Sequence, residues 1–292
     1  MLFAAIDIGS NAARLLLANV FDSTQEPSSA AHVAFFRVPL RLGEDVFHDG
    51  VISEPRITNL VKTLTAFKLL IDVYAPVDFD ICATAAMREA SNREAIIQRV
   101  KKETGLAVRV IDGQEEATII REFNNLFSKY QDETLMYVDV GGGSTEISIL
   151  HDNNFITSRS FNVGTLRILH GKVEKEHWNE MLHWVKQSTL PFKKIACIGS
   201  GGNINKLVKL YGDTPASRIS LKKLNDGYQK LKKMSVDERM EKLQMRPDRA
   251  DVIVPAAKIF SSVMTSAGID MVLAPKLGLV DGLIYELSQK KR

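Results

Sequence analysis

The chain has 292 residues, 45% of them hydrophobic, and its 38 basic and 35 acidic side chains leave a net charge of +3. This length favours one large or two medium domains, and so small a charge argues against a general nucleic-acid-binding protein. No run approaches the ~18 apolar residues of a membrane span, and the N-terminus lacks the basic start of a signal peptide, so we expect no membrane partner.

The first 130 residues have the pattern of three strands followed by alternating helices and strands. Short runs rich in Ala, Val, Ile, Leu and Phe, separated by Gly, Ser, Asn or Pro, predict the strands. Apolar residues recur at helical spacing from Ile57 to Ile71, after Ser53 as a cap and Pro55 in the first turn. The expected strands are 2–8, 13–21, 31–39, 78–83 and 106–111, and two further helices are expected at 91–104 and 114–130.

The rest of the chain repeats this order of elements. Residues 212–248 are an addition to the repeat, and their run "LKKLNDGYQKLKK" predicts a solvent-exposed helix face, with a phosphate-attracting surface as the alternative. The expected strands are 134–140, 145–150, 155–162, 193–198 and 270–274, and the expected helices are 174–189, 202–211, several between 220 and 267, and 278–290.

The repeated order predicts an α/β protein with two tandem domains, at residues 1–128 and 129–292. Each domain is expected to hold a mixed five-stranded sheet with helices on both faces. The boundary is expected near 125–134, where "NNLFSKYQDET" turns polar, and without a long linker the domains should join closely around a cleft. Both cysteines, Cys82 and Cys197, fall in apolar strands, which favours buried free thiols and a cytoplasmic location.

A glycine-rich turn beside an aspartate occurs at the same place in both repeats. Glycine lets backbone N–H groups converge on an anion, and a carboxylate beside them can hold the metal that neutralises phosphate charge. One such turn is ordinarily a hairpin, whereas two equivalent turns indicate a clamp that holds one ligand from both sides. "DIGSN" supplies Asp7, Gly9, Ser10 and Asn11, and "DVGGGSTE" supplies Asp139, Gly141, Gly142, Gly143, Ser144 and Thr145.

A third glycine turn, "IGSGGNINKL", contains Gly201 and Gly202 and opens a helix. Helix N-termini favour anions or the polar edge of a ligand, and simple strand-to-helix packing is the alternative. Together the three turns resemble the phosphate and nucleotide loops of the actin-like superfamily.

A finer resemblance covers almost the whole chain. The motifs "AAIDIGSN", "RLGE", "ATAAMREASN", "IDGQEEA", "YVDVGGGSTE", "NVGTLRI", "IGSGGNINKL", "RADVIVPAAKI" and "LGLVDGLI" occur in this order between residues 4 and 284. This ordered set is similar to the exopolyphosphatase/guanosine pentaphosphate phosphohydrolase (Ppx/GppA) family. The resemblance implies two actin-like (ribonuclease H-like) domains with the active site in the interdomain cleft. It also implies that the C-terminal helix, about 278–292, packs back onto the first domain.

The resemblance implies a phosphohydrolase in which water removes a terminal phosphate. The substrate would be inorganic polyphosphate or a guanosine alarmone, the cofactor Mg²⁺ or another divalent cation such as Mn²⁺, and a homodimer is left open. Glu116, the second glutamate of "GQEEA", matches the catalytic glutamate that orients the water. The alternative is a first-turn acid that complements the helix dipole.

The resemblance also assigns metal and phosphate contacts. Asp139 matches the metal-binding aspartate, Asp7 should face it across the cleft, and Glu146 should reach the water shell of the metal unless it is a solvent-facing strand residue. Phosphate contacts are expected from Ser10, Asn11, Arg88 and the turn at 141–145. Arg88 could instead pair with Glu89 or Glu94, and of the two weaker matches, Arg14 and Arg41, the second could simply pair with Glu44.

Three departures from the family pattern bear on the substrate. Ala12 and Ala13 follow "GSN" where a serine and a hydrophobic residue are usual, and Asn203 stands where threonine is common. The chain stops at Arg292, without the additional helical domain of longer members, so short polyphosphate is expected. Two other functions stay open: an actin-like sugar or small-molecule kinase or ATPase, and a non-catalytic alarmone or polyphosphate sensor. The presence of Glu116 and Asp139 favours the enzyme.

Overall fold

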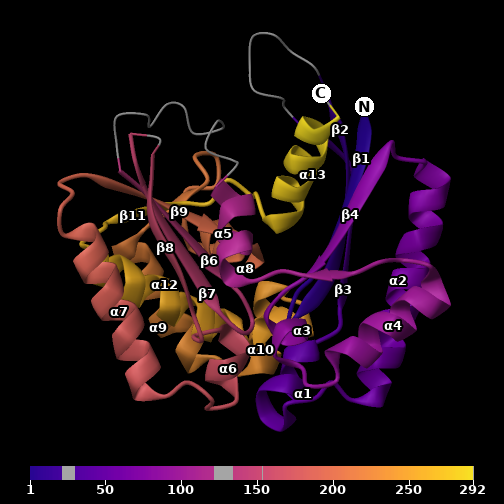
Figure 1. Ribbon diagram of the computed structural model, residues 1–292. Helices are drawn as coiled ribbons and strands as arrows, with labels where there is room; N and C mark the ends of the chain where they lie inside the picture. The colour runs from indigo at the N-terminus through magenta and orange to yellow at the C-terminus, as the bar shows by residue number, and fades with distance from the viewer. Residues whose placement is uncertain (22–29, 122–133, 153, 292) are drawn as a thin grey trace. The chain divides into compact units, whose positions relative to one another are not determined.

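The computed structural model describes residues 1–21, 30–121, 134–152 and 154–291, and it divides the chain into two compact units (Figure 1). The first unit combines Met1–Phe127 with Gly278–Arg292, and the second is Ser128–Leu277. The segment in which the sequence predicts the boundary lies almost entirely outside the described residues. No helix in the described ranges is both long and apolar enough to cross a membrane.

The first unit holds a five-stranded sheet in the order β3-β2-β1-β4-β5. β1 (Leu2–Ile8), β2 (Ala12–Val20) and β3 (Ala30–Pro39) form antiparallel pairs, and β4 (Asp78–Ala83) runs parallel to β1. β5 (Arg109–Val110) is parallel to β4 and much shorter than the predicted strand 106–111. Leu106 and Val108 are buried outside the strand, so their apolar character reflects packing rather than strand pairing.

The helices of this unit include two that were not predicted. α1 and α3 have eight and five residues, which is too short for a helical period to show in the sequence. The long helix begins after Ser53, as predicted, and it ends where Ala75 adopts a left-handed conformation. The six helices are α1 (Leu42–Asp49), α2 (Glu54–Tyr74), α3 (Ala85–Glu89), α4 (Arg93–Thr104), α5 (Gly113–Arg121) and α13 (Leu279–Lys290).

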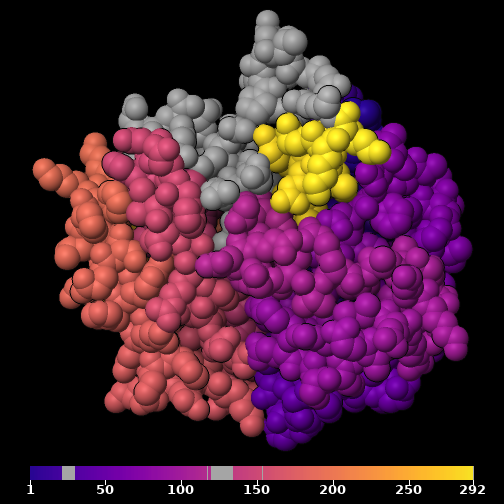
Figure 2. Space-filling model, in the orientation of Figure 1, coloured from indigo at the N-terminus to yellow at the C-terminus, as the bar shows by residue number. Residues whose placement is uncertain are grey.

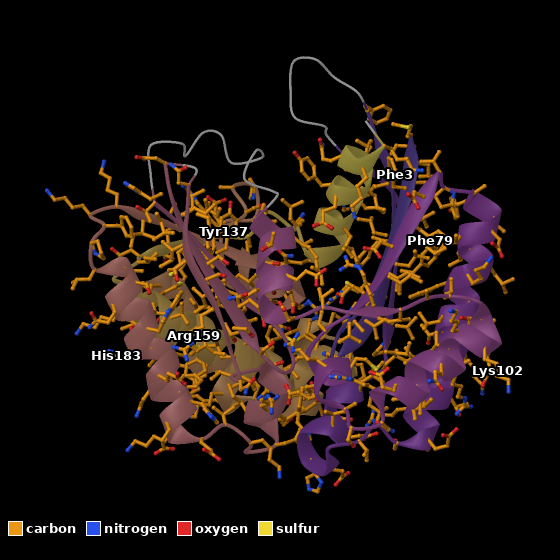
Figure 3. The ribbon with its side chains drawn as sticks, in the orientation of Figure 1. Phe3, Phe79, Lys102, Tyr137, Arg159 and His183 are labelled. Carbon is orange, nitrogen blue, oxygen red and sulfur yellow. The ribbon has the colours of Figure 1, made fainter. Side chains whose placement is uncertain are left out.

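The C-terminal helix α13 packs on the first sheet. Its residues Leu283 and Ile284 share a buried core with Phe3 of β1 and Leu16 of β2 (Figure 3). Figure 2 shows the yellow surface of α13 seated against the purple surface of the same unit. A segment from the end of the chain therefore completes the core of the unit formed by its beginning.

The second unit has a six-stranded sheet in the order β10-β11-β9-β6-β7-β8, so the expected count of five is wrong by one strand. The extra strand is β10 (Arg218–Ser220), which pairs antiparallel with β11 and is too short to show an alternating pattern. The other strands are β6 (Thr134–Val140), β7 (Thr145–His151), β8 (Asn154–Phe161), β9 (Ile195–Ser200) and β11 (Met271–Leu273).

Helices of the second unit surround a buried α12, whose apolar side chains join the core of the sheet. The lysine-rich α9 turns Leu224, Gly227 and Leu231 inward and leaves its lysines exposed, as the sequence predicts. The helices are α6 (Thr165–Leu169), α7 (Lys175–Thr189), α8 (Gly202–Tyr211), α9 (Leu221–Lys233), α10 (Val236–Leu243), α11 (Pro247–Ala250) and α12 (Ile253–Ala267).

Arg239 of α10 links residues 212–248, the addition to the repeat, to the rest of the unit. Its buried guanidinium donates hydrogen bonds to the carbonyl oxygens of Leu231 (3.1 Å), Met234 (2.8 Å) and Ala250 (2.6 Å). Arg239→Met removes this donor from the Met234 and Ala250 carbonyls, whereas the Leu231 carbonyl keeps the Met234 amide (3.2 Å). We expect the substitution to lower the free energy of unfolding by about 3–5 kcal/mol in urea titrations. Arg218→Met, at an exposed surface pair with Asp213, should change it by less than ~0.5 kcal/mol.

Candidate active site

The first glycine turn joins β1 to β2 in a tight connection. The Gly9 amide donates to the Ala12 carbonyl oxygen (3.1 Å), and the strand register sets Asp7 opposite Arg14. The two side chains form an ion pair. On the other side of β1, the parallel strand β4 brings Cys82 into register with Asp7. The aspartate of the first turn therefore has a cation as its neighbour.

The second glycine turn has the same geometry in the second unit. The Gly141 amide donates to the Ser144 carbonyl oxygen (2.9 Å), and the register sets Asp139 opposite Glu146. The parallel strand β9 brings Ser200 into register with Asp139, as β4 does with Cys82 in the first unit. The two repeats are thus built alike, but the cross-strand partner of the aspartate is an arginine in one and a glutamate in the other.

The carbonyl groups of the second turn are held by α6. The Gly141 oxygen accepts the Thr165 amide (3.0 Å), the Gly142 oxygen accepts the Leu166 amide (2.8 Å), and the Gly143 oxygen accepts Nε of Arg167 (2.6 Å). In a trans peptide the N–H group points opposite to the C=O group, so the next three amides face away from α6. No hydrogen bond within the described part of the chain uses the amides of residues 142–144. Unused amides in a glycine-rich turn are the groups that can bind an anion.

Arg167 was not singled out from the sequence, although its motif "NVGTLRI" was noted. Its guanidinium lies at the second glycine turn because α6 begins there. Thr145, by contrast, was expected to offer its hydroxyl to phosphate. It is fully buried, and the hydroxyl donates to the Val163 carbonyl oxygen (2.5 Å), which corrects that expectation. Ser144 is also buried, at the end of the same turn.

The carboxylates of Asp139 and Glu146 are neighbours across β6 and β7. Glu146 is only 4% exposed, which does not fit a solvent-facing strand residue, and Ser160 Oγ donates to its Oε1 (2.8 Å). Like charges on paired strands repel each other, and a cation beside them relieves this repulsion. The third turn adds to this pair, because a Cβ at Gly201, with φ of +94°, would stand 3.1 Å from Asp139 Oδ1.

The donor set of the second unit fits a hard divalent cation such as Mg²⁺. Among the described residues, no group of three or more His, Cys, Asp or Glu side chains is arranged to hold a metal alone. Mg²⁺, however, usually keeps several waters and takes one or two carboxylates together with substrate phosphates. Two carboxylates beside an anion site therefore suit a metal that arrives with a phosphate chain.

Asp7 of the first unit is 2% exposed, and burial raises the pKa of its carboxyl above the ordinary value, an effect that the Arg14 guanidinium opposes. Its Oδ1 is buried and accepts no hydrogen bond from the described residues. Ser10, also buried, and Asn11 occupy the first turn, and their carbonyl oxygens accept the amides of Gly43 (2.9 Å) and Leu40 (3.1 Å). That Asp7 faces Asp139 stays a prediction.

Glu116 lies in the first turn of α5. The Asp112 carboxylate caps this helix by accepting the amides of Gln114 and Glu115, both at 2.8 Å. Glu115 is exposed and pairs with Arg109, whereas Glu116 is 7% exposed. An acid that only complements the helix dipole has no need of burial, so this alternative describes Glu115 better than Glu116.

Arg88 is the charged neighbour of Glu116 in the first unit. Its Nη1 lies 4.0 Å from Glu116 Oε2 and donates to the Ile111 carbonyl oxygen (2.9 Å). Glu94, one of its alternative partners, pairs with Arg93 instead. The carbonyl bond fixes the guanidinium beside the carboxylate and leaves its other N–H groups to reach an anion.

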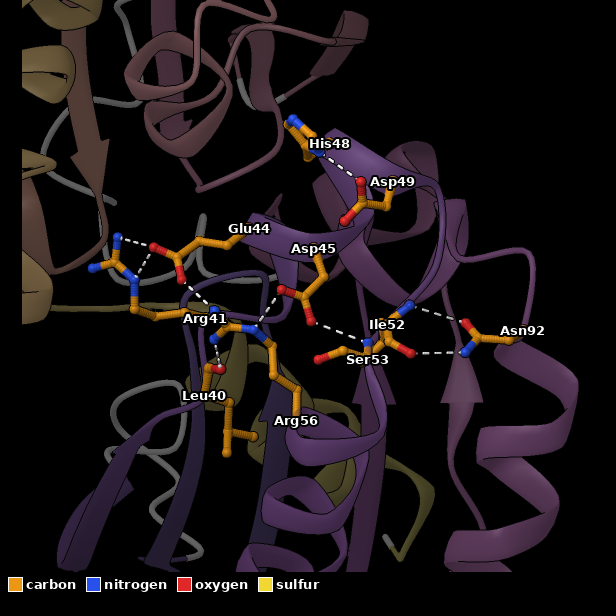
Figure 4. Close-up of polar contacts among 10 residues, drawn as sticks. All are labelled: Leu40, Arg41, Glu44, Asp45, His48, Asp49, Ile52, Ser53, Arg56 and Asn92. Carbon is orange, nitrogen blue, oxygen red and sulfur yellow. Dashed lines mark hydrogen bonds and ion pairs between the residues drawn. The ribbon is translucent and has the colours of Figure 1, made fainter.

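Arg41 pairs with Glu44, as the alternative interpretation of this residue predicted (Figure 4). Arg56 joins the same network by donating to Glu44, to Asp45 and to the Leu40 carbonyl oxygen. The Arg41 backbone amide donates to the Asn11 carbonyl oxygen (3.0 Å). Arg41 thus supports the first glycine turn through its backbone.

The model of the Ppx/GppA phosphatase family matches residues 25–291. The chain belongs to the Ppx/GppA phosphatase family. This membership confirms the resemblance drawn from the motifs and makes the chain a hydrolase, as predicted. The matched range contains the second glycine turn and the motif that holds Glu116.

Curated Ppx/GppA relatives are distant in sequence. A bifunctional 3-dehydroquinate synthase/phosphatase of Fusobacterium nucleatum is 27% identical over 314 residues, which cover 99% of this chain and 47% of that protein. The chain thus spans about half the length of this relative. A putative exopolyphosphatase of Haemophilus influenzae is 22% identical over 300 residues, covering 98% of this chain and 91% of that protein.

Solved structures of the family have the same fold. An exopolyphosphatase from Cytophaga hutchinsonii has a TM-score of 0.86 at 22% identity, covering 99% of this chain and 98% of the other. A Ppx/GppA family member from Aquifex aeolicus has a TM-score of 0.78 at 24% identity, covering 100% of this chain and 99% of the other. These likenesses confirm the predicted α/β class with two actin-like domains.

Proposed function

We propose that this chain releases terminal orthophosphate from inorganic polyphosphate by attack of water. The observation that carries the proposal is the second glycine turn, whose amides of residues 142–144 are unused beside the carboxylates of Asp139 and Glu146. A phosphate chain supplies an anion for the amides, and its cation supplies a positive charge for the carboxylates. The names of the relatives agree, because the proteins from Haemophilus influenzae and Cytophaga hutchinsonii are described as exopolyphosphatases.

We assign to Glu116 the task of orienting the attacking water. Its buried carboxylate accepts a hydrogen bond from the water and directs the oxygen in line with the terminal phosphorus. Arg88, held by the Ile111 carbonyl, donates to the equatorial phosphate oxygens as charge develops. The amides of the second turn, with Ser144, bind the same oxygens. The first turn contributes Ser10, Asn11 and Arg14.

Asp139 and Glu146 would hold a divalent cation. Bound Mg²⁺ or Mn²⁺ would neutralise phosphate charge and polarise the terminal P–O bonds. Gly201 leaves room for the Asp139 carboxylate, and Gly202 lies against the guanidinium of Arg249 at the same turn. The third turn thereby supports the position of Asp139 and borders the phosphate site.

This function is tested by measuring phosphate release from tripolyphosphate, long polyphosphate and guanosine pentaphosphate. Each substrate is assayed once with Mg²⁺ and once with a chelator. We expect release from polyphosphate that the chelator abolishes, and the three rates rank the substrates. A parallel assay contains ATP and a panel of sugars. A phosphorylated sugar without phosphate release from polyphosphate would identify a kinase. Tight binding of guanosine tetraphosphate without any hydrolysis would identify a sensor.

Gly164, just before α6, provides a test of the turn. A Cβ there would stand 2.6 Å from the Gly142 carbonyl carbon and closer still to its oxygen. Gly164→Ala must push the second turn away from α6, and we expect kcat/KM for phosphate release to fall by about 10²-fold. Gly171→Ala is the control. It lies beyond the same helix, and a Cβ added there would have no neighbouring atom within 4 Å, so its cost is local backbone strain. Equal rates for both variants would contradict the assigned role of the turn.

A further inference from the structure

The C-terminal helix α13 packs between the first sheet and α5, the helix that carries Glu116. Leu283 and Ile284 of α13, Phe3 of β1 and Ile119 of α5 belong to one buried cluster. Figure 1 shows α13 in yellow beside β1 and near α5. The side of α5 that supports Glu116 is therefore formed by a segment more than 150 residues away in the chain.

The two helices touch at Gly282, which has no side chain and lies against both the side chain and the backbone of Ile119. A Cβ on Gly282 would stand 2.5 Å from Ile119 Cγ2, 2.6 Å from the Ile119 carbonyl oxygen and 3.1 Å from its carbonyl carbon. Side-chain atoms can rotate away from such a contact, but the backbone oxygen moves only if α5 moves. Ile119 is fully buried, so any added atom at this contact must displace a helix.

α13 is anchored independently of this contact, so α5 is the helix that would move. The Asp281 carboxylate caps α13 by accepting the Gly278 amide (2.8 Å), and it also bonds to Nε2 of His32 on β3 (2.7 Å). The apolar side of α13 lies on β1. The bond to His32 and the apolar packing on β1 therefore hold α13 on the sheet side.

A shift of α5 at Ile119 reaches Glu116, because residues three apart lie on neighbouring positions of one helix face. Glu116 already has little freedom, since it is buried with Arg88 Nη1 at 4.0 Å. Alignment of an attacking water tolerates only about 0.5 Å of error in the group that orients it. A displacement of α5 caused by an added atom at Gly282 is therefore large enough to affect catalysis.

We propose that Gly282 is a positioning residue for Glu116. The missing side chain at this position sets the distance between α13 and α5, and with it the reach of the Glu116 carboxylate toward the attacking water. This inference rests on the role proposed above for Glu116, and it adds a residue that does not touch the substrate.

Gly282→Ala tests the contact through kinetics of phosphate release. We expect kcat to fall by about 10²-fold, because a displacement of about 1 Å has that effect, while KM changes by less than about threefold. In a chain that carries Glu116→Gln, the same substitution should change kcat by less than about twofold, since no carboxylate is left to misplace. Additive losses in the double variant, or a wild-type kcat for Gly282→Ala, would overturn the inference.

Gly227→Ala is the matched control, because a Cβ on Gly227 of α9 would stand 2.5 Å from Tyr211 Cδ2 in the second unit. We expect it to lower thermal stability without lowering kcat. If Gly282→Ala does not fold, Ile119→Ala removes the side-chain part of the contact without a clash and should show the same non-additivity with Glu116→Gln. Absence of phosphate release by the wild type would reject the proposed function, and a wild-type rate for Glu116→Gln would reject the role of Glu116. A slow Glu116→Gln with a normal Gly282→Ala rejects only the positioning role.

Discussion

Replacement of Glu116 by Gln is expected to lower kcat for phosphate release by at least ~10²-fold, the lower range for the loss of a general base. Gln keeps the size and place of the side chain beside Arg88, but it cannot accept a proton from water. Because the phosphate-binding groups are unchanged, KM should change little. Steady-state rates with polyphosphate and Mg²⁺ check this result.

Glu115→Gln is the matched control for this variant. It changes the adjacent residue in the same helical turn, and it removes an exposed ion pair with Arg109 rather than a buried carboxylate. We expect its kcat to stay within about twofold of wild type, because surface pairs contribute little. Equal losses for Glu115→Gln and Glu116→Gln would mean that α5 is merely destabilised, and would remove Glu116 from the reaction.

Replacement of Asp139 by Asn is expected to raise the Mg²⁺ concentration for half-maximal rate by at least ~10²-fold. The substitution keeps the shape of the side chain but removes one of two neighbouring negative charges, which is the feature that suits a divalent cation. Glu146→Gln should act in the same direction, because its carboxylate lies across the strand pair from Asp139. Titration of the rate with Mg²⁺ measures both shifts.

Asp213→Asn serves as the control for Asp139→Asn, because Asp213 is an exposed carboxylate of the same unit that pairs with Arg218. Its Mg²⁺ titration should match that of the wild type. An unchanged titration for Asp139→Asn and Glu146→Gln would show that the cation binds elsewhere, and the pair would then be a structural feature of the turn.

Much of the fold could be predicted because long elements carry a clear periodic signal. The boundaries of α2 and of β6 to β8 follow apolar patterns and turn residues that act within a few positions. Short elements carry no such signal, which is why α1, α3, α6 and β10 were missed. The predicted strand at 106–111 is longer than β5 for another reason, since buried residues are apolar whether or not they pair.

The sequence by itself determined the internal repeat, the two aspartate–glycine turns and the family motif that contains Glu116, because each is a local pattern of residues. Only the tertiary structure decided the partners: Arg14 for Asp7, Glu146 for Asp139, α6 for the carbonyls of the second turn, and Gly282 for α5. Strand register and helix contact depend on packing between distant segments, and a register shift of one residue in β2 or β7 would turn Arg14 or Glu146 to the opposite face of its sheet.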